Sequence, residues 1–63
     1  MIDYTPLWET MKQKNLADYD LIKGGIDNKT LASLKKNESI PLSTLEKLCL
    51  VCGCTPNEVV QFI

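Results

Sequence analysis

The chain contains no histidine and no arginine among its 63 residues. Histidine is the commonest general base and the commonest nitrogen ligand of protein-bound metals, so its absence weakens most enzymatic and zinc-binding interpretations. There is no glycine-rich phosphate loop, no serine or cysteine has an evident base, and the chain is too short to build a deep pocket. The sequence therefore predicts a protein that is not an enzyme and that needs no cofactor.

Long apolar runs are also missing. No segment approaches the roughly 18 consecutive apolar residues of a membrane span. The N-terminal stretch MIDYTPLWETMKQK has neither the basic start nor the apolar centre of a secretory signal. We therefore expect a cytoplasmic protein with no membrane partner.

A strong excess of charge is absent as well, because seven lysines oppose eight acidic residues and the net charge is −1. Bulk charge alone would not indicate a nucleic-acid partner, so the distribution of the lysines must decide. The chain is 44% hydrophobic and 24% charged, a composition typical of a folded domain. At this length we expect one domain, residues 1–63.

All three cysteines lie in one short segment, CLVCGC, at residues 49–54. A zinc site would need a fourth ligand, which only an acidic residue could supply here. A redox pair is expected at a helix N-terminus, where the helix dipole lowers the thiol pKa, whereas this pair falls near a helix C-terminus. Reduced cysteine packs as a small hydrophobe, so we interpret the three residues as part of the core, with no metal.

Apolar residues recur at helical spacing between turn signals, and nothing alternates as a strand does, which predicts an all-α fold. The expected helices cover residues 5–14, 18–23, 27–36, 43–53 and 55–63. Thr5 and Asp27 are expected N-caps, and Ser43 with Glu46 and Thr55 with Glu58 form two expected capping boxes. Asn15, Asn37 and Gly53 are the expected helix stops.

The most informative segment is LADYDLIKGGIDNKTLASLKKN, residues 16–37. A short helix, a glycine turn at Gly25, an apolar residue, a capping residue and a second helix form the pattern of a helix-turn-helix, here at about 17–37. The angle between the two helices would be set by four apolar residues: Leu21, Ile26, Leu31 and Leu34.

With this segment and the fourth-helix motif STLEKL, nearly the whole chain resembles the Cro and phage-repressor type of helix-turn-helix domain, also called Xre-like. The resemblance implies a compact five-helix bundle. It also implies a bacterial or phage transcriptional regulator that binds a double-stranded DNA operator sequence-specifically, usually as a homodimer. No small-molecule effector is indicated.

The resemblance further implies that the helix from Asp27 to Lys36 is the recognition helix. Base edges in the major groove would be met by Asn28, Lys29, Ala32 and Ser33. By donor and acceptor geometry Asn28 suits adenine and Lys29 suits guanine, while Ala32 would face thymine methyl groups. Phosphates would be met by Thr30, Lys36 and Asn37. Independently of the resemblance, Tyr19 is expected at the surface and is a further candidate for a hydrogen bond to phosphate.

One position departs from the family pattern. The family typically opens its second helix with a small hydroxyl residue and a glutamine that touches the DNA backbone, whereas this chain has Ala17 and Asp18. Asp18 would face phosphate, and the lysines from residue 18 to residue 36 outnumber the acids only by four to three. The alternative is therefore a protein-interaction module on the same scaffold, with weak or no DNA binding.

The C-terminal segment EVVQFI is richer in apolar residues than one helix stripe can bury. We expect Val59, Phe62 and Ile63 to form the interface of a two-fold dimer. The other interpretation is that Phe62 and Ile63 fold back over Trp8.

Overall fold

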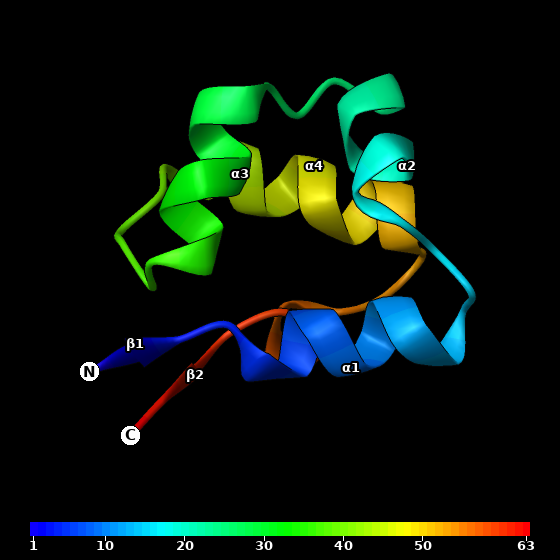
Figure 1. The fold of residues 1–63 in the computed structure, drawn as a ribbon. Coiled ribbons are helices and arrows are strands. Elements are labelled where there is room, and N and C mark those ends of the chain that lie inside the picture. The colour runs from blue at the N-terminus through cyan, green and yellow to red at the C-terminus, as the bar shows by residue number, and fades with distance from the viewer.

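Four α-helices and a two-stranded sheet make up the computed structural model, which describes all 63 residues (Figure 1). The sheet pairs the two ends of the chain and is called the terminal hairpin below. The helices are α1 (Thr5–Gln13), α2 (Asp18–Lys23), α3 (Asn28–Lys35) and α4 (Leu42–Cys52), followed by a single 3-10 turn at Pro56–Glu58. The strands β1 (Ile2–Asp3) and β2 (Gln61–Phe62) pair antiparallel, with Ile2 opposite Phe62. In Figure 1, α1 and the hairpin lie on one side of the molecule, and α2, α3 and α4 lie on the other.

The helix stops are where the sequence predicts them. Asn15 and Asn37 have positive φ values of 58° and 56°, and Gly53 has a φ of 62°. Each residue follows closely on a helix end, where a left-handed residue terminates the hydrogen-bond ladder. The predicted bounds of α2, Asp18–Lys23, are confirmed.

The expectation of a fifth helix is wrong. Helical geometry after α4 is limited to the three residues of the 3-10 turn, and the chain then extends into β2. The capping box of Thr55 and Glu58 does form, with the Thr55 amide donating to Glu58 Oε1 at 3.2 Å. The expectation of no strands is corrected too, because β1 and β2 form a two-stranded sheet.

Contacts with α1 explain why the last helix stops after one turn. The Thr10 hydroxyl donates to the Glu58 carbonyl at 2.8 Å, and the Leu7 amide donates to the Val59 carbonyl at 3.1 Å. These are carbonyls that a continuing helix would use for its own ladder. The extended chain gains the pairing with β1 instead, so tertiary contacts override a local preference for helix.

Two predicted helix starts are also corrected. The helix α4 begins at Leu42, one residue earlier than expected, and its N-terminus has no side-chain cap, so Ser43 and Glu46 do not form a capping box. The N-cap of α1 is Tyr4. Thr5 does not cap, because its hydroxyl donates to Asp3 Oδ1 at 2.8 Å.

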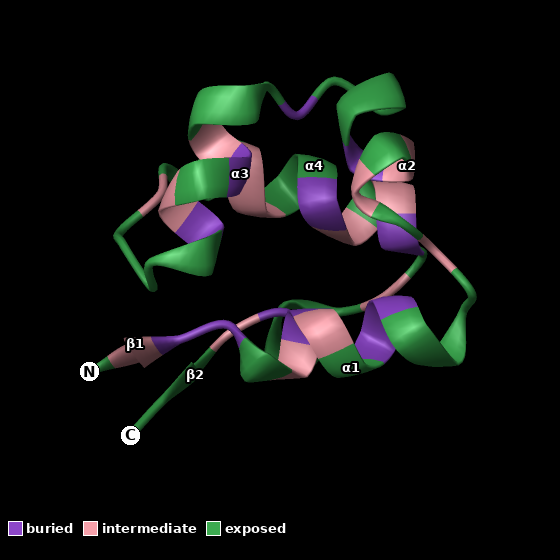
Figure 2. Cartoon of the chain, viewed as in Figure 1, coloured by how far each residue is buried: buried purple, intermediate pink, exposed green.

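The core lies where the inner stripes of the four helices meet the residues beside the hairpin (Figure 2). Its ten buried hydrophobic members are Tyr4, Leu7, Met11, Leu21, Ile26, Leu31, Leu34, Leu48, Cys52 and Val59. All four apolar residues expected to set the angle of the helix-turn-helix belong to it, whereas Ile22, next to Leu21 on α2, is 39% exposed.

Tyr4 ties the N-terminal segment to the loop after α3. Its hydroxyl donates to the Glu38 carbonyl at 2.6 Å, and its amide donates to Asn37 Oδ1 at 3.0 Å. Burial raises the pKa of Tyr4, so the phenol stays protonated and remains a donor. The end of α3 is therefore fixed against the start of α1.

The cysteines pack as core residues. Cys52 is buried on α4, and Cys49 and Cys54 are half-buried against the same cluster. Burial raises the pKa of Cys52, and it raises the pKa of Cys54 to about 11. These thiols are therefore protonated near neutral pH, which suits packing better than nucleophilic chemistry.

The close approach of α2 to α4 depends on Gly24. A Cβ atom at this position would lie 2.3 Å from Val51 Cγ2. We expect Gly24→Ala to lower the free energy of unfolding by about 1–3 kcal/mol, because a stiff β-branched side chain must move. Urea denaturation measures the change.

The double variant Gly24→Ala/Val51→Ala separates this clash from a backbone effect. It should be more stable than the sum of the two single changes implies, since the second removes the atoms that the new methyl group meets. Gly25→Ala is the matched control. Gly25 has a φ of 108°, so an alanine there has a strained backbone, but nothing lies near its Cβ position. Val51→Ala should therefore not restore the stability that Gly25→Ala loses. If the double variant lost as much free energy of unfolding as the two single variants together, the steric explanation would be contradicted.

Candidate nucleic-acid interface

The helices α2 and α3 are joined by a tight turn at residues 24–27 (Figure 1). Gly25 takes the positive φ that the turn requires, and Ile26, 2% exposed, anchors the turn in the core. Asp27 then starts α3, with its Oδ1 accepting a hydrogen bond from the Thr30 amide at 2.7 Å. The predicted N-cap and the predicted helix-turn-helix arrangement are both present.

The helix α3 has one buried and one exposed face. Leu31 and Leu34 hold it to the core at 8% and 0% exposure. The outer face carries the side chains expected to meet bases, Asn28, Lys29, Ala32 and Ser33, together with Lys36. Their spacing of i, i+1, i+4, i+5 and i+8 places them on one side of a helix. All are exposed except Ser33, which is half-buried.

The other predicted phosphate contacts flank this face. Tyr19 on α2 is 70% exposed, and Thr30 is half-buried at the start of α3. Asn37 stands just beyond the end of α3, where its Oδ1 accepts from the Tyr4 amide. That bond occupies the oxygen of the Asn37 side chain and leaves its amide hydrogens free to donate.

Asp18 has a partner that sequence reasoning missed. Lys35 Nζ, in the last turn of α3, lies 2.9 Å from Asp18 Oδ2 in the first turn of α2. Both side chains are about half exposed, so the pair adds little to stability. Its main effect is electrostatic, because it neutralises the acid that the sequence analysis expects to face phosphate.

The other two acids of the helix-turn-helix are engaged within the protein as well. Asp20 Oδ2 accepts from the Ala17 amide at 2.7 Å. The hydrogen bonds from Thr30 lower the pKa of Asp27, and the positive charges of Lys29 and Lys47 lower it further. Lys47, on α4, is a cation beside this face that the sequence analysis did not single out.

Three lysines of the helix-turn-helix remain outside any ion pair. The pair between Lys35 and Asp18 is the one salt bridge of the molecule. Lys23, Lys29 and Lys36 are exposed, and their ammonium groups face solvent. The surface thus presents three unpaired cations beside two carboxylates, Asp20 and Asp27, which accept from backbone amides and remain charged.

The dimensions of α3 match those of a nucleic-acid groove. An α-helix with its side chains is about 10–12 Å in diameter. The major groove of B-form DNA is about 12 Å wide and admits one helix. Figure 1 shows α3 at the periphery of the molecule, with no element covering its outer side.

The three residues expected to form a dimer interface are not placed alike. Val59 is 0% exposed and belongs to the core, so this expectation is wrong for Val59. Its backbone hydrogen bond to α1 draws the side chain inward. Phe62 and Ile63 are 81% and 75% exposed, which also contradicts the interpretation that they fold over Trp8.

The molecule has no helix that is both long enough and apolar enough to cross a membrane. It also has no group of three or more acidic or cysteine side chains arranged to hold a metal ion.

The fold is similar to that in a crystal structure of the transcriptional regulator VanUg, with a TM-score of 0.88 and 24% sequence identity. The match covers 95% of this chain and 81% of that chain. A search of curated proteins found no match.

The family model described as the Cro/C1-type HTH DNA-binding domain matches residues 6–63. That range includes α2, α3, α4, the glycine turn, β2 and all of α1 except Thr5. The chain therefore belongs to the Cro/C1-type family of helix-turn-helix DNA-binding domains.

Proposed function

We propose that this protein is a cytoplasmic transcriptional regulator of the bacterial or phage type. It binds a double-stranded DNA operator sequence-specifically, as a homodimer and without a small-molecule effector. The observation that carries the proposal is the outer face of α3, where Asn28, Lys29, Ala32 and Ser33 stand together while Leu31 and Leu34 fix the opposite face. Three free cysteines suit a reducing compartment.

In the proposed complex α3 lies in the major groove and reads base edges. The Asn28 amide pairs with the N6 and N7 atoms of adenine, and the Lys29 ammonium donates to O6 and N7 of guanine. Ala32 contacts a thymine methyl group, and Ser33 contacts a base edge as a donor or an acceptor. Thr30, Lys36, Asn37 and Tyr19 hold phosphates and so fix the register of the helix.

The charge distribution supports binding more than the net charge does. Asp18 is paired with Lys35, so the remaining charges of the helix-turn-helix are the unpaired lysines Lys23, Lys29 and Lys36 against Asp20 and Asp27, which accept from backbone amides and keep their charge. Unpaired lysines can release the counterions condensed on DNA, which is the main source of affinity that does not depend on sequence. We expect moderate rather than strong non-specific binding, because few cations face the DNA.

A protein-interaction module is the second candidate. The net charge of −1 and the acid at position 18 favour it. Salt dependence separates the two functions, because counterion release gives DNA binding a steep dependence on salt, whereas a largely apolar protein contact has a shallow one.

The test is selection from a randomised duplex library at two salt concentrations. Enrichment of a palindromic motif whose binding weakens as salt rises supports a dimeric regulator that reads sequence. No enrichment at low salt would reject DNA reading and favour the protein-interaction module.

Asp18→Asn is expected to strengthen DNA binding about two- to tenfold at low salt. The substitution removes a negative charge from the phosphate side and releases Lys35, so the log–log salt slope should steepen by about one unit. Fluorescence anisotropy at several salt concentrations measures both quantities. Glu9→Gln on α1 makes the same charge change away from α2 and α3 and should have a smaller effect. Weaker binding by Asp18→Asn would mean that the bridge to Lys35 positions α3.

A further inference from the structure

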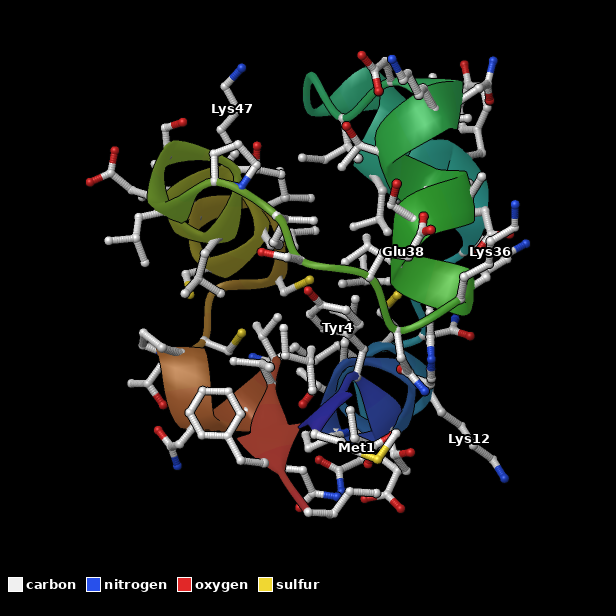
Figure 3. All side chains as sticks on the ribbon, turned by 90° about the vertical axis from the view of Figure 1, so that its left-hand side faces the viewer. Met1, Tyr4, Lys12, Lys36, Glu38 and Lys47 are labelled. Carbon is white, nitrogen blue, oxygen red and sulfur yellow. The ribbon has the colours of Figure 1, made fainter.

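Tyr4 lies outside the helix-turn-helix but contacts the end of its second helix. The residue is 2% exposed, and its carbonyl accepts from the Leu7 amide at 2.9 Å at the start of α1. Both donors of Tyr4 go to the loop after α3: the amide to Asn37 Oδ1 and the hydroxyl to the Glu38 carbonyl. Figure 3 shows Tyr4 between the N-terminal segment and this loop. One buried residue therefore holds the loop at two points.

The bond from the Tyr4 amide fixes which way the Asn37 carboxamide faces. A backbone amide can only donate, so the atom beside it must be the oxygen of the side chain and not the nitrogen. The Nδ2 group is on the opposite arm of the same planar carboxamide and points away from Tyr4. Asn37 is exposed, and its Nδ2 group makes no hydrogen bond within the protein. Two N–H donors thus face solvent in a fixed direction.

The backbone at Asn37 is fixed as well. Its φ is 56°, and its amide donates to the Leu34 carbonyl at 3.2 Å. The next amide, that of Glu38, donates to the Ser33 carbonyl at 2.9 Å. Together these bonds close the C-terminus of α3 and leave few conformations open to the chain. Main chain and side chain are therefore both ordered before any ligand binds, which lowers the entropic cost of binding.

Asn15 shows that ending a helix does not by itself require such a side chain. It follows the end of α1 with a φ of 58° and is also exposed. Its side chain forms no hydrogen bond, whereas that of Asn37 accepts from Tyr4. Glycine would end either helix equally well, because it adopts positive φ without steric cost. The orientation of the Asn37 side chain therefore points to a role beyond helix termination.

We infer that Tyr4 is a positioning residue for DNA binding: its amide orients the Asn37 side chain and its hydroxyl holds the loop, so that Asn37 Nδ2 donates to a phosphate of the DNA backbone. The inference rests on the proposed function, which places Asn37 at a phosphate. A carboxamide N–H is a neutral donor, so it adds a hydrogen bond to a phosphate oxygen without adding a cation. Tyr4 itself is enclosed by the protein and acts through Asn37.

DNA binding by variants of Asn37 tests the contact with phosphate. The probe is a labelled duplex of mixed sequence and about 20 base pairs, two helical turns, because a phosphate contact does not depend on sequence. Asn37→Gly keeps the left-handed backbone and removes the carboxamide. We expect the dissociation constant to rise about five- to tenfold in fluorescence anisotropy titrations. The log–log salt slope should not change, because the lost donor carries no charge.

Asn15→Gly is the matched control, because it makes the same change at a left-handed position whose side chain has no partner. It should leave the dissociation constant within about twofold of wild type. Asn37→Asp keeps an oxygen for the Tyr4 amide but turns a negatively charged acceptor outward. It should fold like the wild type and bind more weakly than Asn37→Gly. Wild-type affinity of Asn37→Asp would show that no phosphate lies there.

Tyr4→Phe tests the positioning role. It keeps the buried ring and removes the bond to the Glu38 carbonyl, so we expect the dissociation constant to rise about threefold. In the Asn37→Gly background the same change should have little further effect, because no side chain remains to be positioned. An equal fold-change in both backgrounds would mean that Tyr4 acts only on the stability of the fold. Circular dichroism melts set a temperature at which every variant is folded, and binding is measured there.

Two-dimensional nitrogen–hydrogen NMR spectra observe the contact without any substitution. The side-chain amide resonances of Asn37 should shift as the duplex is added, and those of Asn15 should not. Unmoved Asn37 resonances at saturating duplex would overturn the inference, and so would wild-type affinity of Asn37→Gly, while the proposed function would stand. A wild-type chain that binds no duplex at low salt would overturn both.

Discussion

Replacing Leu34 by alanine is expected to leave the domain close to its unfolding midpoint. Leu34 is 0% exposed, and only 12 of 63 residues are buried, so few other side chains can compensate. Truncating a buried leucine costs about 2–5 kcal/mol. A domain of this length has a total stability of only about 3–9 kcal/mol.

Urea denaturation followed by circular dichroism measures this effect. Leu50→Ala is the matched control, because Leu50 is 77% exposed on α4 and should change the free energy of unfolding by less than about 0.5 kcal/mol. Similar midpoints for Leu34→Ala and Leu50→Ala would mean that α3 is not held by the core in the way described here.

The second large effect is expected on the affinity for DNA. Lys29→Ala should weaken binding to the selected operator by about 1–3 kcal/mol and relax the preference at one base pair, because a donor to guanine is lost. Anisotropy titrations with the operator and with duplexes changed at single positions measure both results.

Lys36→Ala and Lys12→Ala serve as the two comparisons. Lys36, expected to meet phosphate, should lower affinity for all sequences alike and reduce the salt slope by about one unit. Lys12 lies on α1, and its replacement should have little effect. A uniform loss for Lys29→Ala, with unchanged base preference, would place Lys29 on the phosphate backbone instead.

Local signals in the sequence are sufficient to predict most of the helical scaffold. Asp27 caps α3, and Asn15, Asn37 and Gly53 terminate helices in the left-handed conformation. These features depend on residues within one turn of each other, so they can be read without knowing the fold. The inner face of α3 follows from helical periodicity in the same way.

Features that depend on contacts between distant parts of the chain could not be predicted. The segment after Pro56 has a capping box and apolar residues, yet it becomes one 3-10 turn and a strand because Thr10 and Leu7 bind its carbonyls. The burial of Val59 has the same origin. Neither contact leaves a periodic signal in the sequence.

The candidate site also combines features that the sequence predicts with features that depend on contacts between distant residues. The family resemblance points to Asn28, Lys29, Ala32 and Ser33, and the structure places these four side chains on one side of α3. The bridge between Asp18 and Lys35 joins residues 17 positions apart, across a turn whose angle is set by the core. The sequence therefore reveals the acid that is expected to face phosphate, but not the lysine beside it.

The hairpin also determines the order in which native contacts can form. Its outermost hydrogen bond joins the Met1 amino group to the Ile63 carbonyl, 62 positions away, across two strands of two residues each. Closing so long a loop has a large entropic cost, and so short a ladder returns little enthalpy until the helices are already packed. We therefore expect the two ends to be the last part of the chain to become protected from solvent during folding and the first to exchange their amide hydrogens in the native state.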